Sequence, residues 1–179
     1  MNIRQLCAAV MPVAMLAMPA SAHGPTPQQA EHRIEIAAAP EAVWDILRDP
    51  ATIAVWHPDI ASAEMEGEGQ GGKRTITFAE GGSVIDGIDR IDDTAMHIRW
   101  RLSHEDPDSF PVSYYTNDVT VEPVPDGAEV VWKASFYRAD TTNEPQDRFS
   151  DQAAIDAMKK FITDGLEGLK TQAETSPEG

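Results

Sequence analysis

The feature that most constrains the fold is the segment over residues 146–173, because no other stretch keeps a helical period over several turns. Apolar residues recur there every three or four positions, and charged residues occupy the opposite side. The apolar stripe consists of Ala154, Met158, Phe161, Ile162, Gly165, Leu166 and Leu169. A helix with so wide an apolar stripe is stable only when another element covers it. The sequence therefore predicts one long amphipathic helix that packs against another layer.

The layer that covers this helix is expected to be a single antiparallel sheet. Short segments that alternate apolar and polar residues follow one another, separated by turns rich in glycine, proline and aspartate. These segments span residues 31–37, 60–66, 73–78, 83–91, 95–103, 112–122 and 127–137. After the first, residues 40–47 and 51–55 predict two short helices. The order predicts an α+β fold, with a curved sheet of about seven strands around the long C-terminal helix and two short helices after strand 1.

The beginning of the chain has the pattern of a secretory signal peptide over residues 1–22. Arg4 precedes an apolar run, and the small residues 20–22 (ASA) form a cleavage site. The single cysteine, Cys7, lies within this segment, so we expect no disulfide and no thiol chemistry after cleavage. We therefore expect a periplasmic protein with no membrane insertion after signal cleavage. Its expected parts are an extended arm over 23–30, one folded domain over 31–173 and a flexible tail over 174–179.

The formal charge of −16 argues against nucleic acid and anionic membranes as partners, because both require a basic surface. The charge is compatible with a basic protein partner, and it is equally explained by the solubility of an exported protein. Cleavage after residue 22 would make His23 the new N-terminus, whose amine and imidazole could hold copper. No second histidine is placed to complete that site, and the alternative is an ordinary processed end. We expect neither a metal nor a cofactor.

Strand alternation also predicts which polar side chains point inward. Arg74 shares a face with Ile76 and Phe78, so it must pair with an internal acid, Asp86 or Glu64, or with a ligand anion. An apolar inner face with a few polar groups suits a small-molecule cavity. The residues predicted to line it are Trp56, His57, Arg74, Phe78, Trp100, Tyr115, Asn117, Trp132, Phe136, Met158, Phe161 and Ile162. Gly165 leaves two alternatives, a hollow beneath the helix or a close approach of helix and sheet.

Catalytic motifs are scarce in the sequence. No two histidines have zinc-ligand spacing on a helix, and no serine lies in a glycine-flanked elbow. His57 beside Asp59 is the one candidate acid–base pair, and the alternative is that residues 56–58 form a structural corner. The sequence therefore predicts no catalytic residues, but if the protein is an enzyme we expect His57, Asp59, Arg74 and Tyr115 around the substrate.

Several segments resemble a known superfamily. Residues 40–47 (PEAVWDIL), 56–58 (WHP) and 72–74 (GKR) resemble the SRPBCC helix-grip proteins, which include START lipid-binding domains, birch-pollen-allergen-like proteins and polyketide cyclase/dehydrase relatives. Within that group the chain resembles the exported MxaD-like proteins, accessory factors of periplasmic methanol oxidation. The segments that carry this likeness are 23–27 (HGPTP), 111–115 (PVSYY), 136–140 (FYRAD), 153–158 (AAIDAM) and 165–170 (GLEGLK).

The resemblance implies a sheet that grips the last helix around a cavity, and a role in assisting a quinoprotein alcohol dehydrogenase and its cytochrome c. Two functions are therefore expected. The first is a non-enzymatic periplasmic protein that binds a small hydrophobic or amphipathic ligand and assists a periplasmic dehydrogenase or cytochrome c. The second is a cyclase or dehydratase that acts on an aromatic or polyketide-like substrate. The fold hosts both classes, so the chemistry of the site must decide.

Overall fold

A computed structural model describes residues 25–175 as seven strands, three α-helices and two short 3-10 turns. The predicted signal peptide, His23 and residues 176–179 lie outside the described residues. The elements are β1 (Gln28–Ile36), α1 (Pro40–Leu47), η1 (Pro50–Thr52), α2 (Ile53–Trp56), β2 (Ile60–Glu66), β3 (Lys73–Phe78), β4 (Ser83–Asp92), β5 (His97–His104), β6 (Val112–Val124), β7 (Gly127–Arg138), η2 (Asp147–Phe149) and α3 (Asp151–Thr175).

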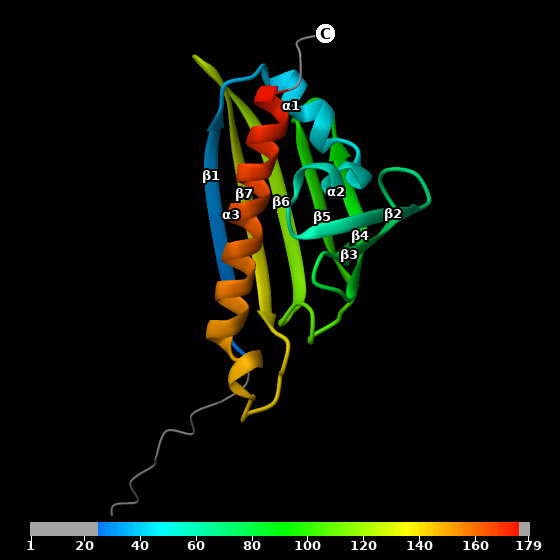
Figure 1. Ribbon diagram of the computed structural model, residues 1–179, viewed down its shortest axis with the longest axis vertical. Coiled ribbons are helices and arrows are strands. Elements are labelled where there is room, and N and C mark those ends of the chain that lie inside the picture. Colours follow the sequence, from blue (N-terminus) through cyan, green and yellow to red (C-terminus); the bar gives the residue numbers. More distant parts are fainter. Residues whose placement is uncertain (1–24, 176–179) are drawn as a thin grey trace, which may run out of the picture.

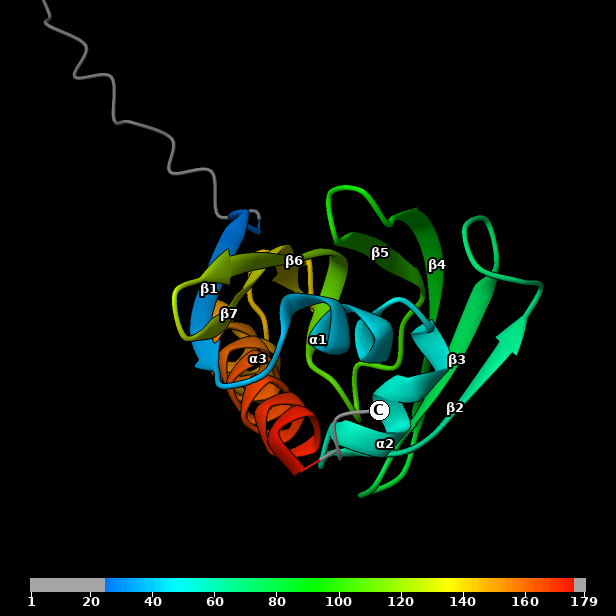
Figure 2. The same cartoon turned by 90° about the horizontal axis from the view of Figure 1, so that it is seen from above.

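The strands form one antiparallel sheet in the order β1-β7-β6-β5-β4-β3-β2. Figure 1 shows α3 running along the sheet, and Figure 2 shows the sheet curving so that α3, α1 and α2 lie on its concave side. The predicted fold class is confirmed. Between residues 25 and 175, no helix is long and apolar enough to cross a bilayer.

Two elements, β1 and α3, have a boundary that differs from the expected one by more than two residues. Strand β1 begins at Gln28, inside the predicted arm, because it pairs with β7 from Gln28 opposite Phe136 to Ile36 opposite Ala128. Helix α3 begins at Asp151, after the η2 turn, and runs to Thr175, into the predicted tail. The bounds of β2 to β7 agree with the predicted ones within two residues.

The apolar stripe of α3 is buried at every predicted position. Close packing of this helix depends on its glycines. A Cβ atom on Gly165 would lie 2.8 Å from His57 Cδ2 and 2.9 Å from Trp132 Cζ3, and one on Gly168 would lie 1.9 Å from the Trp56 carbonyl oxygen. Of the two alternatives for Gly165, the structure shows close approach rather than a hollow.

The strand alternation holds across the inner face, with two local departures. On β7 the side chains of Val130, Trp132, Ala134, Phe136 and Arg138 are buried. Met96, expected to point inward from a strand, instead lies in the turn before β5 with φ of 44°. A bulge in β6 gives Tyr114 a φ of 49° and leaves it 71 % exposed, while Tyr115 remains inside. One extra residue in a bulge changes which face a side chain takes.

Candidate functional site

Aromatic rings fill the centre of the concave face. Trp132 lies at this centre, with its ring centroid 5.4 Å from that of Trp100, 5.7 Å from Phe161, 6.2 Å from Trp56 and 6.5 Å from His57. Edge-to-face contacts at such distances are the favoured geometry of aromatic pairs. Beside Arg74, Trp56 and Trp100 lies a space of about 10 Å³. That volume holds at most one water molecule.

His57 is fixed by hydrogen bonds at both ring nitrogens. Its Nδ1 accepts from the backbone N–H of Asp59 at 3.2 Å, so Nε2 carries the proton and donates to the Phe161 carbonyl at 2.9 Å. Burial lowers the pKa of His57 to about 4, so the ring is neutral. The Asp59 carboxylate does not orient the imidazole, because it accepts from Lys160 Nζ at 2.7 Å. This geometry matches a structural corner rather than an acid–base pair.

Arg74 is paired internally, as one of the predicted alternatives requires. Its Nη2 and Nε donate to Asp86 Oδ2 at 2.7 and 3.2 Å, its Nη1 donates to the Pro50 carbonyl at 2.9 Å, and its guanidinium lies over the Trp100 ring. Asp86 Oδ1 accepts a short hydrogen bond from the Tyr115 hydroxyl. Of the two candidate acids, Asp86 is the partner and Glu64 is not.

The network around Asp86 is buried and internally satisfied. Burial raises the pKa of Asp86 despite its contact with Arg74, and burial also raises the pKa of Tyr115. Arg74 and Tyr115 meet at Asp86, whereas His57 and Asp59 meet α3. The four residues of the enzyme hypothesis therefore form two separate hydrogen-bonded groups.

A cavity of about 470 Å³ opens instead at the end of the sheet away from α1. It lies between the β3–β4 turn, the β5–β6 loop and the N-terminal half of α3. Its floor is aromatic, because the Phe110 ring lies 5.7 Å from that of Phe78 and 5.4 Å from that of Phe161. The residues around it are Asp59, Phe78, Ala79, Glu80, Gly81, Gly82, Asp108, Ser109, Phe110, Pro111, Ala157, Lys160 and Phe161. We call this space the loop-end cavity.

The two loops that wall the loop-end cavity are held together by Asp106. Its Oδ2 accepts from the Ser83 backbone N–H at 3.1 Å and from the Ser109 hydroxyl at 2.7 Å. The Ser109 hydrogen bond is the main reason why the pKa of Asp106 is lowered. Gly82 permits this approach, since its φ is +78° and a Cβ atom there would lie 1.6 Å from Ser109 Oγ. The cavity wall is thus held in place by contacts within the protein.

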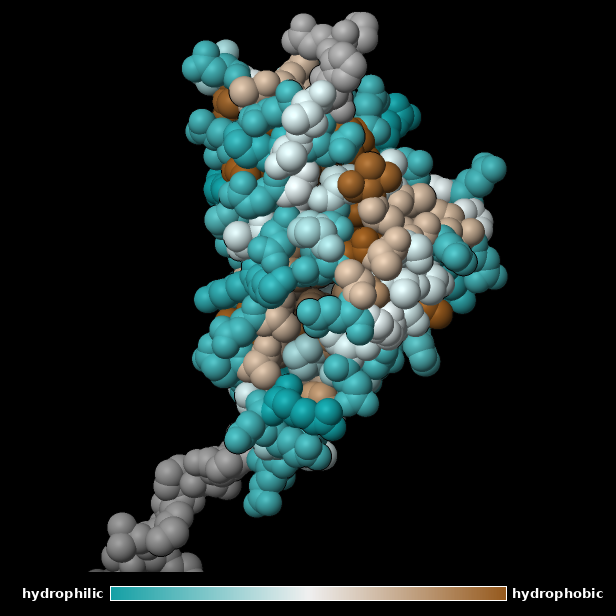
Figure 3. Space-filling model, viewed as in Figure 1, coloured by the Kyte–Doolittle hydropathy of each residue, from teal (hydrophilic) through white to brown (hydrophobic). Residues whose placement is uncertain are grey.

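Of the twelve residues predicted to line a cavity, Phe78 and Phe161 lie around the loop-end cavity. Trp56 and His57 border a shallow groove between α2 and α3, and Ile162 borders another surface hollow. Figure 3 shows a hydrophobic patch over α2, where Val55 is 68 % exposed. Arg74 and Trp100, together with Trp56, border the 10 Å³ space. The core holds Tyr115, Asn117, Trp132, Phe136 and Met158.

Sequence reasoning missed the cavity residues that come from loops and from the polar side of α3. Phe110 is the clearest, since it is the only large apolar residue in the predicted polar loop 104–111. An apolar ring in such a loop is a signal that the loop folds back onto the core. Ala157 and Lys160 flank the apolar stripe of α3 and carry no comparable signal.

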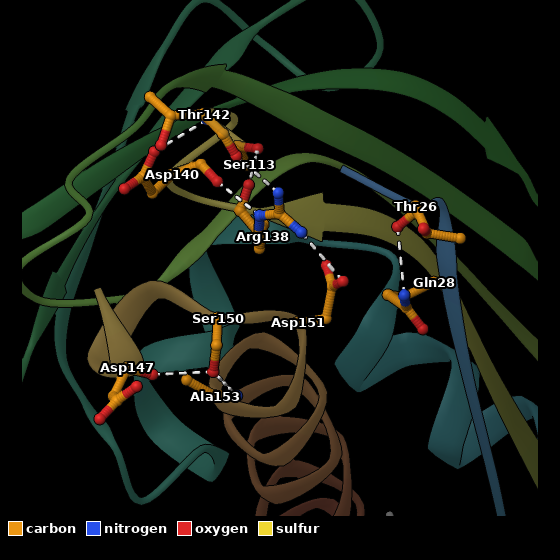
Figure 4. Close-up of polar contacts among 10 residues, drawn as sticks. All are labelled: Thr26, Gln28, Ser113, Arg138, Asp140, Thr142, Asp147, Ser150, Asp151 and Ala153. Carbon is orange, nitrogen blue, oxygen red and sulfur yellow. Dashed lines mark hydrogen bonds and ion pairs between the residues drawn. The ribbon is translucent and has the colours of Figure 1, made fainter. Parts of the chain in front are cut away.

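A further polar cluster surrounds the buried Arg138, at the end of β7 (Figure 4). Its side chain donates to the Asp140 carbonyl at 2.6 Å, to the Thr142 carbonyl at 2.7 Å and to Asp151 Oδ2 at 3.0 Å. Its own carbonyl accepts from the Ser113 hydroxyl at 2.7 Å. These bonds tie the end of the sheet to the start of α3, which is a structural role. Among residues 25–175, no group of three His, Cys, Asp or Glu side chains is arranged to hold a metal ion.

The family of the chain is shown by its sequence. Residues 27–174 match the family described as "Polyketide cyclase / dehydrase and lipid transport", and the chain belongs to it. This confirms the expected membership of the SRPBCC superfamily. No curated protein sequence matches the chain.

Solved structures share the fold. The protein XoxI from Bacillus cereus has a TM-score of 0.70 at 20% identity, over 84% of this chain and 99% of that one. The Zhui aromatase/cyclase from a Streptomyces species has a TM-score of 0.72 at 18% identity, over 83% and 94%. Norcoclaurine synthase from Thalictrum flavum, in complex with dopamine and hydroxybenzaldehyde, has a TM-score of 0.66 at 12% identity, over 94% and 100%. At these identities the likeness concerns the fold alone.

Proposed function

We propose that the protein is a non-enzymatic binding protein that holds a small hydrophobic or amphipathic molecule in the loop-end cavity. The observation that carries the proposal is the space of about 470 Å³ with an aromatic floor and a polar rim. Ligand sites are typically concave, mainly apolar and equipped with a few polar groups. The family description includes lipid transport, and one protein of the same fold is described with two small aromatic molecules bound.

The alternative function is a cyclase or dehydratase that acts on an aromatic or polyketide-like substrate. The family description and the aromatase/cyclase of similar fold favour it. Around the cavity, however, Asp59 and Lys160 neutralise each other. Glu80 and Asp108 are the remaining titratable groups there, and both are exposed on the rim. None of the described residues that line the space is a buried acid or base, so the geometry supports binding better than proton transfer.

The proposal is tested by titrating the full chain with N-phenyl-1-naphthylamine, a neutral apolar probe that fluoresces when shielded from water. Ala157→Trp fills the loop-end cavity, and Gln152→Trp adds the same ring on the exposed side of α3 as a matched control. We expect wild type and Gln152→Trp to bind alike and Ala157→Trp to bind at least about ten-fold more weakly. Equal binding by a folded Ala157→Trp variant, or no binding by wild type, would overturn the proposal.

We further propose that the protein acts in the periplasm beside a quinoprotein alcohol dehydrogenase or its cytochrome c. The support is the sequence resemblance to MxaD-like proteins and the charge of −16, which suits a basic partner. The test is fractionation of cells that express the tagged full chain, followed by affinity capture from the periplasm at low salt. Recovery of the protein in the cytoplasm, or capture without either partner, would contradict this assignment.

A further inference from the structure

We propose that the loop-end cavity selects amphiphiles with a cationic head, such as small aromatic amines, over carboxylates of the same shape, and that Glu80 pairs with the cation. The inference rests on the proposed ligand-binding function and adds the chemical class of the ligand. The inference depends on two observations: the cation on the cavity rim has carboxylate partners within the protein, and one acid on the rim has no partner among the described residues.

The charge of the cation on the cavity rim, Lys160, is already matched by two carboxylates. Its Nζ lies 2.6 Å from Asp164 Oδ2 and 2.7 Å from Asp59 Oδ2. The hydrogen bonds to Asp164 and Asp59 raise the pKa of Lys160, so its charge is permanent. Two of the three N–H donors of this ammonium face carboxylates, and an anion at the third would lie beside both acids. Lys160 with Asp59 and Asp164 carries a net charge of −1, so this group does not attract a ligand carboxylate.

The acidic side of the rim is less completely matched. Asp108 contacts Arg148 Nη1 at 2.8 Å, in an exposed pair. The side chain of Glu80, in the β3–β4 turn, makes no hydrogen bond or ion pair with any residue between 25 and 175. Among the described residues around the cavity, its carboxylate is thus the charge without a partner. The overall charge of −16 gives the mouth a negative field, which attracts cations and repels anions.

The floor complements a cationic aromatic ligand. The rings of Phe78, Phe110 and Phe161 can hold an apolar body, and their faces also attract a nearby cation. An ammonium beside Glu80 would lie at the rim, where it keeps part of its hydration. A carboxylate there would face Glu80 and Asp108 at once. The amine and the carboxylate have the same shape, so the difference in their affinities should come from their charge.

The experiment measures displacement of N-phenyl-1-naphthylamine by three ligands with one ring and one chain length: 3-phenylpropylamine, 3-phenylpropanol and 3-phenylpropanoate. At pH 7 and low salt we expect the amine to bind most tightly and the acid most weakly, with at least about a ten-fold ratio between them. The ratio should shrink at about 0.3 M salt, because exposed charges are screened. Glu80→Gln should weaken the amine about three- to five-fold and leave the alcohol unchanged. Glu68→Gln, in the β2–β3 hairpin at the opposite end of β3, is the matched control.

The outcomes separate this inference from the proposed function. If the alcohol binds but amine and acid bind equally, or the acid binds more tightly, charge selection is wrong and ligand binding stands. If the amine is preferred equally in Glu80→Gln and in the control, the role of Glu80 is wrong. If neither the probe nor any of the three ligands binds, the proposed function fails, and this inference fails with it.

Discussion

The close approach of α3 to the short helices predicts a graded response to alanine at three glycines. Gly165 and Gly168 both lie on the inner side of α3, whereas Gly87 lies in β4, where a Cβ atom would meet no heavy atom within 4 Å. In a helix, exchange of glycine for alanine alone stabilises by about 1 kcal/mol. Destabilisation at Gly165 or Gly168 must therefore come from the space that the new methyl group lacks.

The expected magnitudes follow from the distances. The methyl group of Gly165→Ala would meet His57 and Trp132 at 2.8 to 2.9 Å, and both side chains are buried, so overpacking of about 2 to 3 kcal/mol leaves a net loss of about 1 to 2 kcal/mol. Gly168→Ala would meet the Trp56 carbonyl oxygen at 1.9 Å, which the backbone can relieve only by moving. We expect a net loss of more than about 2 kcal/mol there, and between no change and a gain of about 1 kcal/mol for Gly87→Ala.

The assay is urea unfolding of each variant, followed by tryptophan fluorescence and far-UV circular dichroism, with the free energy of unfolding extrapolated to water. The expected order of stability is Gly87→Ala first, then Gly165→Ala, then Gly168→Ala. If Gly168→Ala is as stable as wild type, α3 does not lie against the Trp56 carbonyl. If all three variants lose the same free energy, steric space is not the cause.

Three further predictions concern the core and the cavity wall. The pKa of His57 is about 4 in the folded state and about 6.5 in the unfolded state, so the unfolded state binds a proton more readily. The free energy of unfolding should therefore fall by up to about 3 kcal/mol as the pH drops from 6.5 to 4. Chemical denaturation of His57→Gln should show a smaller fall over the same pH range. Arg74→Met should lower the free energy of unfolding by about 3 to 5 kcal/mol, because it leaves Asp86 buried without its cation. The double variant Arg74→Met with Asp86→Leu should recover much of that loss. A double variant as unstable as the single one would contradict the pairing. Gly82→Ala should weaken binding of N-phenyl-1-naphthylamine, because the new methyl group would push Ser109 away from the cavity wall. The loss of affinity should be measurable at a temperature where thermal unfolding shows that the variant is folded. Unchanged probe binding would count against this wall.

The sequence predicts the long helix and the strands because their apolar residues repeat with the period that burial on one face requires. The stripe of α3 and the alternation of β7 both follow from burial on one face. Arg74 shows how far such reasoning reaches. Its inward direction follows from its neighbours Ile76 and Phe78, and the need for a counter-charge follows from burial. The choice of Asp86 over Glu64 depends on strand register, which places Arg74 directly opposite Asp86.

The location of the cavity could not be predicted from the same patterns. Strand alternation predicts which side chains point inward, but it does not predict how completely those side chains fill the interior. Trp132 with the rings around it fills the centre, while Gly82 and Ser109 bring two loops together and leave space between those loops and α3. Contacts between loops depend on tertiary structure, and loops have no period to read. Phe110 therefore falls in a predicted polar loop, although its ring belongs to the floor.

The central claim is that a small molecule binds against the aromatic floor of the loop-end cavity. Its most direct test is a set of intermolecular nuclear Overhauser effects between bound N-phenyl-1-naphthylamine and protein with labelled aromatic side chains. The account predicts contacts from the probe to the rings of Phe78, Phe110 and Phe161. Contacts to Trp100 or Tyr115 in their place would locate the ligand in the core and contradict the account.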